Sequence, residues 1–176
     1  MIPAQQQLEN HMRFGLALCS QAMNGSEGDD ELFFVAVNQI NRAGPAVLSD
    51  MNQKMMVAAL NLKAGKRSIE MSDFSAALAL FQHGISFLDN SESWASQYSL
   101  NLELYDAAVE TACALNDAGS VRRLSAQVIA NARCEDDKLS SLYAVVKSLR
   151  LAFKFVDSKK VAYTMLEQVS NGVEVR

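Results

Sequence analysis

Proline and glycine are scarce in this sequence, with two and eight residues among 176. Both interrupt helices, so their scarcity favours long helices and argues against a β-sandwich, which needs many more turn residues. The hydrophobic fraction of 49% is sufficient for one compact core. These features predict an all-α protein with a single domain over residues 1–176.

Cysteine and histidine are also rare. Cys19, Cys113 and Cys134 are far apart and form no C-x-x-C pair. This spacing argues against a disulfide framework or a zinc site and predicts three buried thiols in a reducing compartment. Neither His11 nor His83 has a second ligand at metal spacing. We therefore expect no metal and no cofactor.

Long apolar runs and clustered basic charge are missing as well. No segment approaches the roughly 18 uncharged apolar residues of a membrane span. The N-terminus has no apolar core of a secretory signal, which predicts a cytoplasmic protein with no membrane partner. The net charge of -4 argues against a nucleic-acid partner. The densest basic run of the first half is interleaved with apolar residues and is interpreted as a solvated helix face: Lys63, Lys66 and Arg67.

Catalytic motifs are absent too. The sequence contains no G-x-x-x-x-G-K-[ST] phosphate loop, no kinase catalytic loop and no G-x-S-x-G nucleophile elbow. We expect no catalytic residues, and the chain is predicted not to be an enzyme.

The stretch from Leu60 to Tyr105 carries the clearest positive signal. Small and aromatic residues recur there at every third or fourth position, which places them on one face of a helix. Their order is that of a tetratricopeptide-like hairpin, in which small residues allow close approach and an aromatic ring fills the gap: Gly65, Phe74, Ala77, Phe81 and Gly84.

The whole chain can be read as such hairpins, forming a TPR-like α-solenoid of about eight helices. The predicted pairs are 1–45, 49–91, 94–134 and 136–171. The expected helices run over 3–23, 31–41, 50–71, 72–88 and from Ser96 to Leu115, with three further apolar stripes over 121–132, 142–153 and 161–169. Asp73, Asp117 and Asp157 mark the turns roughly forty residues apart, a longer period than the usual ~34.

An ordered set of residues carries a family resemblance. It comprises His11, Gly15, Leu16, Leu32, Phe33, 37–41, 60–65, Trp94, Tyr98, Leu100, Leu102, Ala107, Ala108, Glu110, Asp137, Lys138 and Tyr143. In this order the chain resembles the helical repeat region of large multidomain signalling proteins. In those proteins a predicted AAA-type ATPase is followed by such repeats and joined to serine/threonine or histidine kinase modules. Here Asn116 replaces the glycine expected at the turn of the second hairpin.

The resemblance implies a non-catalytic segment for protein interaction or regulation. Its partner is then a protein or peptide, or a neighbouring domain of a longer chain. One hypothesis is a fragment of an ATPase-and-kinase-type signal transduction protein. The alternative is a stand-alone TPR-like adaptor that binds a peptide in its groove.

The predicted groove supplies the candidate partner-binding residues. In tetratricopeptide-like arrays the first helix of each pair lines the groove. Counting from the turn acids places six charged residues there, whose alternation in sign favours a partner of mixed charge: Lys63, Lys66, Asp106, Glu110, Arg150 and Lys154. The competing interpretation is that they belong to solvated helix faces.

Trp94 is the only tryptophan and precedes the helix predicted from Ser96. One interpretation is that its ring folds over the preceding hairpin and sets the angle between repeats. The other is that it stacks on a ligand.

Overall fold

The computed structural model describes residues 3–24, 30–89 and 93–173. These residues form nine α-helices and two short 3₁₀ helices, and they include no strand. They group into two compact units, residues 1–90 and residues 91–176. This division does not test the single domain expected from the sequence, which stays a prediction.

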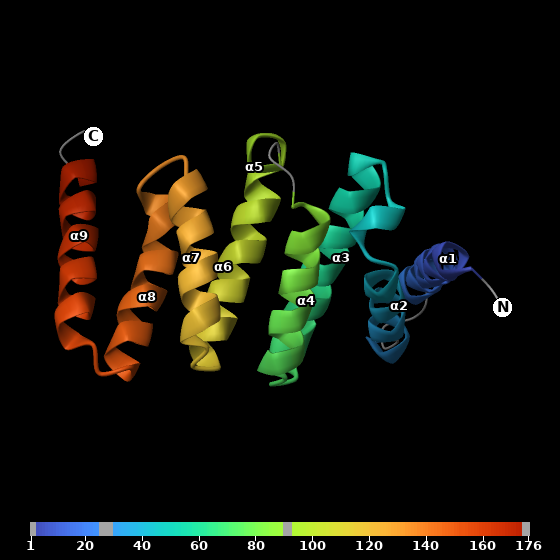
Figure 1. Ribbon diagram of the computed structural model, residues 1–176, viewed down its shortest axis with the longest axis horizontal. Coiled ribbons are helices and arrows are strands. Elements are labelled where there is room, and N and C mark those ends of the chain that lie inside the picture. The colour runs from blue at the N-terminus through green and yellow to red at the C-terminus, as the bar shows by residue number, and fades with distance from the viewer. Residues whose placement is uncertain (1–2, 25–29, 90–92, 174–176) are drawn as a thin grey trace. The chain divides into compact units, whose positions relative to one another are not determined.

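The first unit consists of two antiparallel helix pairs (Figure 1). In the first, α1 packs against α2; in the second, α3 packs against α4; and α2 also touches α3. The helices and the 3₁₀ turn that follows α2 are α1 (Ala4–Asn24), α2 (Asp30–Ala43), η1 (Pro45–Val47), α3 (Met51–Glu70) and α4 (Phe74–Phe87). The four helices predicted from the sequence are confirmed to within two residues at each end.

Local capping explains this agreement. Asp50 precedes α3 and accepts a hydrogen bond from the Asn52 amide at 3.2 Å, while Asp73 precedes α4 and accepts one from Ala76 at 2.9 Å. An N-cap carboxylate satisfies an amide that has no partner within the helix. The helix starts are thus determined by residues next to them in the sequence.

The predicted seam between α3 and α4 is confirmed at Gly65 and Phe81 but is wrong at Phe74, which begins α4 and is 38% exposed. Phe81 is fully buried, and its ring lies so close to Gly65 that a Cβ there would be 2.3 Å from Cε1. Gly84 is buried as well. A glycine in α3 is therefore what allows the aromatic ring of α4 to approach the helix backbone.

Polar pairs join the other helices of this unit. Asn41 of α2 and Asn61 of α3 exchange two amide hydrogen bonds, at 2.8 and 2.9 Å, and Asn61 also donates to the Val57 carbonyl. His11 Nδ1 of α1 lies 2.7 Å from Gln39 Oε1 of α2. Because a buried amide is costly without partners, the asparagine pair fixes the register of α2 on α3.

The second unit consists of a short helix followed by two further antiparallel pairs (Figure 1). Helix α6 packs against α7, and α8 packs against α9 as well as against α6 and α7. Its elements are α5 (Ser93–Ser96), α6 (Tyr98–Ala114), α7 (Ala118–Asn131), η2 (Asp136–Lys138), α8 (Leu139–Leu151) and α9 (Phe155–Val173). The core holds Leu104, Val109, Val121, Leu124 and Val128, all at most 1% exposed.

Several expectations for this unit were wrong. Trp94 lies within a separate turn of helix, α5, instead of directly before the helix predicted from Ser96, which begins at Tyr98. Phe153 and Lys154 lie beyond the end of α8, not in it, because the chain turns at Phe153 with a φ of 58°. Cys134 follows α7 and is exposed, whereas Cys19 and Cys113 are buried as predicted.

Three helices end in the same way. After α3, α6 and α8 the chain places Ser72, Asn116 and Phe153 in the left-handed region, at φ of 63°, 58° and 58°. Each time two amides after the helix end donate back to carbonyls of its last turn. This is the Schellman arrangement, usually built with glycine. Asn116 thus occupies the turn position at which the family resemblance led us to expect glycine.

Of the three predicted turn residues, Asp73, Asp117 and Asp157, the third is wrong. Asp73 and Asp117 directly follow the left-handed residue and cap α4 and α7. Lys154 occupies the corresponding position before α9, whereas Asp157 lies inside the first turn of that helix.

None of the described helices is both long and apolar enough to cross a membrane.

Candidate functional site

The six candidate partner-binding residues are divided between the two units. Lys63 and Lys66 are exposed on α3 of the first unit. The other four belong to the second unit, where Asp106 and Glu110 lie on α6 and Arg150 and Lys154 lie in or just after the last turn of α8.

In the first unit, the basic run of α3 lies against α2. The Lys63 Nζ is 5.5 Å, and the Arg67 guanidinium carbon 5.0 Å, from the centre of the buried Phe33 ring. Arg67 also forms an ion pair with Asp30 in the first turn of α2. Two cations of this run thus contribute to packing through cation–π contacts, while their charged ends stay accessible.

In the second unit, Asp106 and Glu110 lie one helical turn apart and face the start of α8. Glu110 is exposed and accepts a hydrogen bond from the Ser140 hydroxyl at 3.3 Å. Asp106 is half-buried, and its Oδ1 is buried without a hydrogen-bond partner among the described residues. The two carboxylates therefore differ sharply in their hydration.

Burial of Asp106 has an electrostatic consequence. Desolvation, reinforced by the nearby charges of Glu110 and Asp137, raises the pKa of the Asp106 carboxyl to about 6. A carboxylate that loses water without gaining a donor is destabilised in its charged form. Asp106 is consequently poorly suited to be an exposed charge that selects a partner.

Arg150 and Lys154 line different hollows. Arg150 lies beside Tyr143, Lys147 and Phe155 in a cavity of about 290 Å³. Lys154 borders a smaller cavity of about 90 Å³ together with Val121 and Arg122 of α7. The turn at Phe153 separates the two side chains.

The acidic and basic candidates of the second unit therefore do not come together. Glu110 contacts Ser140 at the start of α8, whereas Arg150 lies in its last turn. Ten residues of helix separate these points by ~15 Å. The acidic side chains thus lie near the start of α8, and the basic side chains lie near its end.

A second polar cluster, at the start of α6, was not foreseen. The Tyr98 hydroxyl donates to Asp137 and accepts from the Arg133 amide at 2.8 Å. The Arg133 guanidinium lies 4.2 Å from the centre of the Tyr98 ring and donates to the Ala95 carbonyl at 2.9 Å. These bonds fasten α5 and the start of α6 to the segment between α7 and α8.

This arrangement stabilises Asp137 as a carboxylate. The hydrogen bond from Tyr98 holds the pKa of Asp137 below its ordinary value, and burial together with the same bond raises the pKa of Tyr98. Trp94 completes the cluster, with its ring centre 5.2 Å from that of Tyr105 and 6.0 Å from that of Tyr98. Its predicted contact with the preceding hairpin, which belongs to the first unit, stays a prediction.

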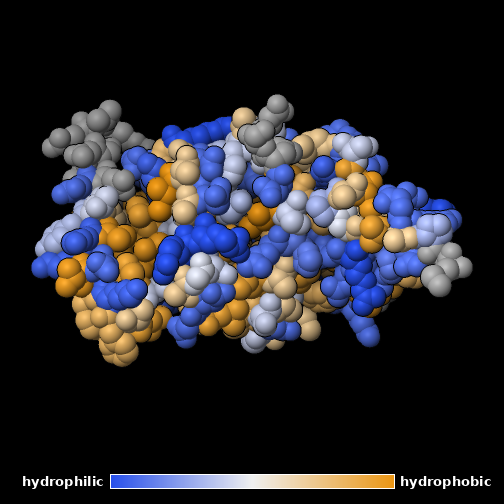
Figure 2. Space-filling view, in the orientation of Figure 1, coloured by the Kyte–Doolittle hydropathy of each residue, from blue (hydrophilic) through white to orange (hydrophobic). Residues whose placement is uncertain are grey.

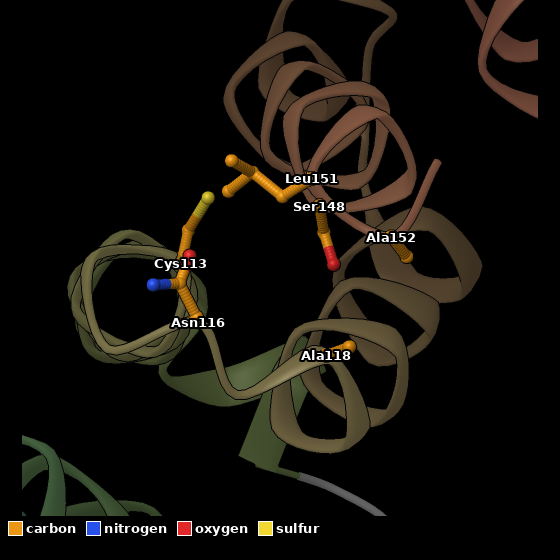
Figure 3. A pocket seen from close by; sticks show the side chains of 6 residues that line it. All are labelled: Cys113, Asn116, Ala118, Ser148, Leu151 and Ala152. Carbon is orange, nitrogen blue, oxygen red and sulfur yellow. The ribbon is translucent and has the colours of Figure 1, made fainter. Parts of the chain in front are cut away.

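A hollow of about 270 Å³ opens among the ends of α6, α7 and α8. Figure 3 shows the Cys113 sulfur directed toward Leu151 and the Ser148 hydroxyl directed into this space. Cys113 is buried and its Sγ lies 3.8 Å from the Ala144 carbonyl. Both histidines of the chain belong to the first unit. No imidazole from this unit is therefore present to activate either side chain.

Comparison of the chain with protein-family models, with curated proteins and with solved structures gave no match. The family resemblance seen in the sequence accordingly stays a prediction. Among the described residues, no group of three or more histidine, cysteine, aspartate or glutamate side chains is placed to hold a metal ion.

Sequence reasoning missed the Tyr98–Arg133 cluster and the residues around Arg150. Arg133 comes 35 residues after Tyr98, and no local pattern relates the two. The Phe153-Lys154-Phe155 triplet was a usable signal, since two aromatic residues around a lysine fit poorly into a helix core. The exposure of both rings, 81% and 60%, agrees with that signal.

Proposed function

We propose that the chain is a TPR-like α-solenoid that acts as a non-catalytic segment for protein interaction or regulation in an ATPase-and-kinase-type signal transduction protein. The observation that carries this proposal is the repeated helix stop after α3, α6 and α8. Recurrence of the same Schellman helix end, followed each time by an antiparallel partner helix, is expected of tandem helical repeats.

The seam of the α3–α4 pair supports the same proposal. Gly65 against Phe81 is the small-to-aromatic contact expected of a tetratricopeptide-like hairpin. Stacked hairpins expose long helix faces, and proteins built from them bind partners on those faces. The alternative of a stand-alone TPR-like adaptor is favoured by the exposed hollow beside Arg150, which has room for side chains of a bound peptide.

Sequencing of the transcript distinguishes a segment of a larger protein from a stand-alone adaptor. An in-frame phosphate loop upstream of the present sequence supports the segment of a larger ATPase-and-kinase protein. An in-frame stop codon upstream excludes it and leaves the stand-alone adaptor.

A calorimetric titration tests the non-catalytic part of the proposal. The chain lacks a phosphate loop, so we expect no heat of binding when ATP with Mg²⁺ is added to the purified chain. A dissociation constant near micromolar, or release of phosphate from ATP, would contradict a purely non-catalytic role.

A further inference from the structure

The hollow beside Arg150 combines apolar walls with positive charge. It lies between α8 and the first turn of α9 and measures about 290 Å³. Its lining consists of Tyr143, Val146, Lys147, Arg150, Leu151 and Phe155. Tyr143, Lys147, Arg150 and Leu151 follow the helical spacing that places them on one face of α8.

The apolar part of this lining is open to water. Tyr143, Leu151 and Phe155 are 61%, 53% and 60% exposed, and the Phe153 ring meets Phe155 edge-on at 6.1 Å. Figure 2 shows hydrophobic side chains gathered where α8 turns into α9, at the lower left of the view. A cluster of exposed large apolar side chains is typical of a binding surface, because leaving it in water costs free energy.

Phe153 adds a further exposed ring to this apolar surface. It occupies the left-handed position at which the two equivalent turns carry Ser72 and Asn116. A bulky residue is sterically unfavourable there, and glycine or asparagine would avoid most of that strain. An aromatic ring held at the tip of the turn despite this strain extends the apolar surface beyond the hollow.

The charge around the hollow is positive and is not neutralised within the described part of the chain. Lys147 and Arg150 line it, neither forms an ion pair with a described residue, and no acidic side chain contributes to the lining. Residues 139–167 contain five basic side chains (Lys147, Arg150, Lys154, Lys159 and Lys160) against Asp157 and Glu167. A complementary ligand must supply carboxylates as well as apolar groups.

We propose that this surface, the α8–α9 hollow with the Phe153 tip, binds an acidic amphipathic helical segment of a partner protein. Apolar side chains of the segment enter the hollow against Tyr143 and Phe155, and its carboxylates pair with Lys147 and Arg150. A concave surface suits a protruding side chain better than a lipid bilayer, which favours a peptide over a membrane. The proposal rests on the proposed interaction role and assigns it a site and a partner chemistry.

Fluorescence anisotropy with the full chain tests this proposal. The probe is a labelled peptide of about 18 residues, or five helical turns, with leucine at i, i+3, i+4 and i+7 and glutamate elsewhere. The control peptide carries lysine in place of every glutamate. We expect the glutamate peptide to bind at least about tenfold more tightly than the lysine peptide, and its affinity to fall as salt rises.

Paired charge reversals locate the site. Lys147→Glu with Arg150→Glu should weaken binding of the glutamate peptide by about five- to tenfold, the scale expected for two exposed ion pairs. Arg13→Glu with Arg42→Glu makes the same change in net charge in the first unit and should leave affinity within about twofold. Phe155→Ser should weaken binding without changing charge. Circular dichroism of each variant verifies that it remains folded.

Four results would overturn the proposal. They are absence of binding by the glutamate peptide, equal binding of both peptides, equal loss of affinity in both charge-reversed pairs, and no loss in Phe155→Ser. Sedimentation of the chain with phosphatidylserine–phosphatidylcholine vesicles, if abolished by Lys147→Glu with Arg150→Glu, would assign the surface to lipid instead. Dimerisation abolished by Phe155→Ser would assign it to a second copy. None of these results affects the transcript or ATP experiments, which test the proposed function separately.

Discussion

Among the residues that the structure describes, Asp106 has a pKa that its surroundings shift strongly. Its pKa rises from 3.8 to about 6, chiefly because the carboxyl is partly buried without a donor for Oδ1. An unfolded aspartate releases its proton near pH 4, whereas folded Asp106 retains it to about pH 6. The folded state therefore binds the additional proton between these values, and Asp106 lowers stability as the pH rises through that interval.

Replacement of Asp106 by asparagine should remove this effect. We expect Asp106→Asn to raise the free energy of unfolding at pH 7 by about 1–2 kcal/mol, a value reduced for the partial exposure of the group. Below about pH 3, where the carboxyl is protonated in both the folded and the unfolded state, the gain should vanish. Urea denaturation across this pH range measures it.

Glu70→Gln is the matched control, because Glu70 is exposed on α3. It removes one negative charge from an exposed helix face, so it should not reproduce the stabilisation expected of Asp106→Asn. If Asp106→Asn and the parent lose stability in parallel as the pH rises, the carboxyl is hydrated in solution and its assigned burial is wrong.

The contact between helices α3 and α4 depends on the size of one side chain. Because a Cβ at Gly65 would lie 2.3 Å from Phe81 Cε1, an alanine there requires the ring or the helix to move. We expect Gly65→Ala to destabilise the chain by about 1–3 kcal/mol, the usual cost of overpacking a core. This outcome reverses the ordinary helix preference for alanine over glycine.

Gly119→Ala provides the comparison in α7. There the nearest atom to a new Cβ is Asp117 Oδ1 at 3.4 Å, so alanine should be neutral or raise stability by up to about 1 kcal/mol. Thermal denaturation measures both variants. In addition, Phe81→Ala should make Gly65→Ala harmless, because it removes the atoms that clash. Equal melting of Gly65→Ala and the parent would show that the seam adapts freely.

At the scale of the whole molecule, the two compact units differ in their long-range contacts. In the first, α2 and α3 share the buried asparagine pair, while in the second α8 packs against α6, α7 and α9. Most contacts in both units join helices adjacent in the sequence. Such local packing permits one region to open while another stays folded.

Amide hydrogen exchange of Phe81→Ala tests this expectation. Loss of a fully buried ring costs about 3–5 kcal/mol, so exchange in α3 and α4 should accelerate by about a hundredfold or more. Protection of α8 and α9 should change much less, since the α6 and α7 helices against which α8 packs belong to the second unit. Phe14→Ala, which truncates a ring already 56% exposed, should leave the whole pattern unchanged. Equal acceleration in both units would show that the chain unfolds as one.

Helix content and most helix ends followed from the sequence, because their causes are local. Asp50, Asp73 and Asp117 each cap a helix through an amide two or three residues away. Phe33, Val37 and Ile40 likewise follow helical spacing and form one buried face of α2. The predicted end of α8 was wrong at Phe153. Nothing in the neighbouring sequence indicates that a phenylalanine will adopt the left-handed backbone conformation usually found at glycine.

The candidate site was decided by the tertiary structure. Charge and helix position alone grouped Asp106 and Glu110 with Arg150 and Lys154, but packing of α6 on α8 half-buries Asp106 and leaves the basic pair at the far end of α8. The Tyr98 hydroxyl meets Asp137 across 39 residues of chain, and the α8–α9 hollow is lined by side chains of two different helices. Hydration of a charge and the shape of a hollow both depend on atoms brought together by folding, whereas a helix cap depends only on its neighbours along the chain.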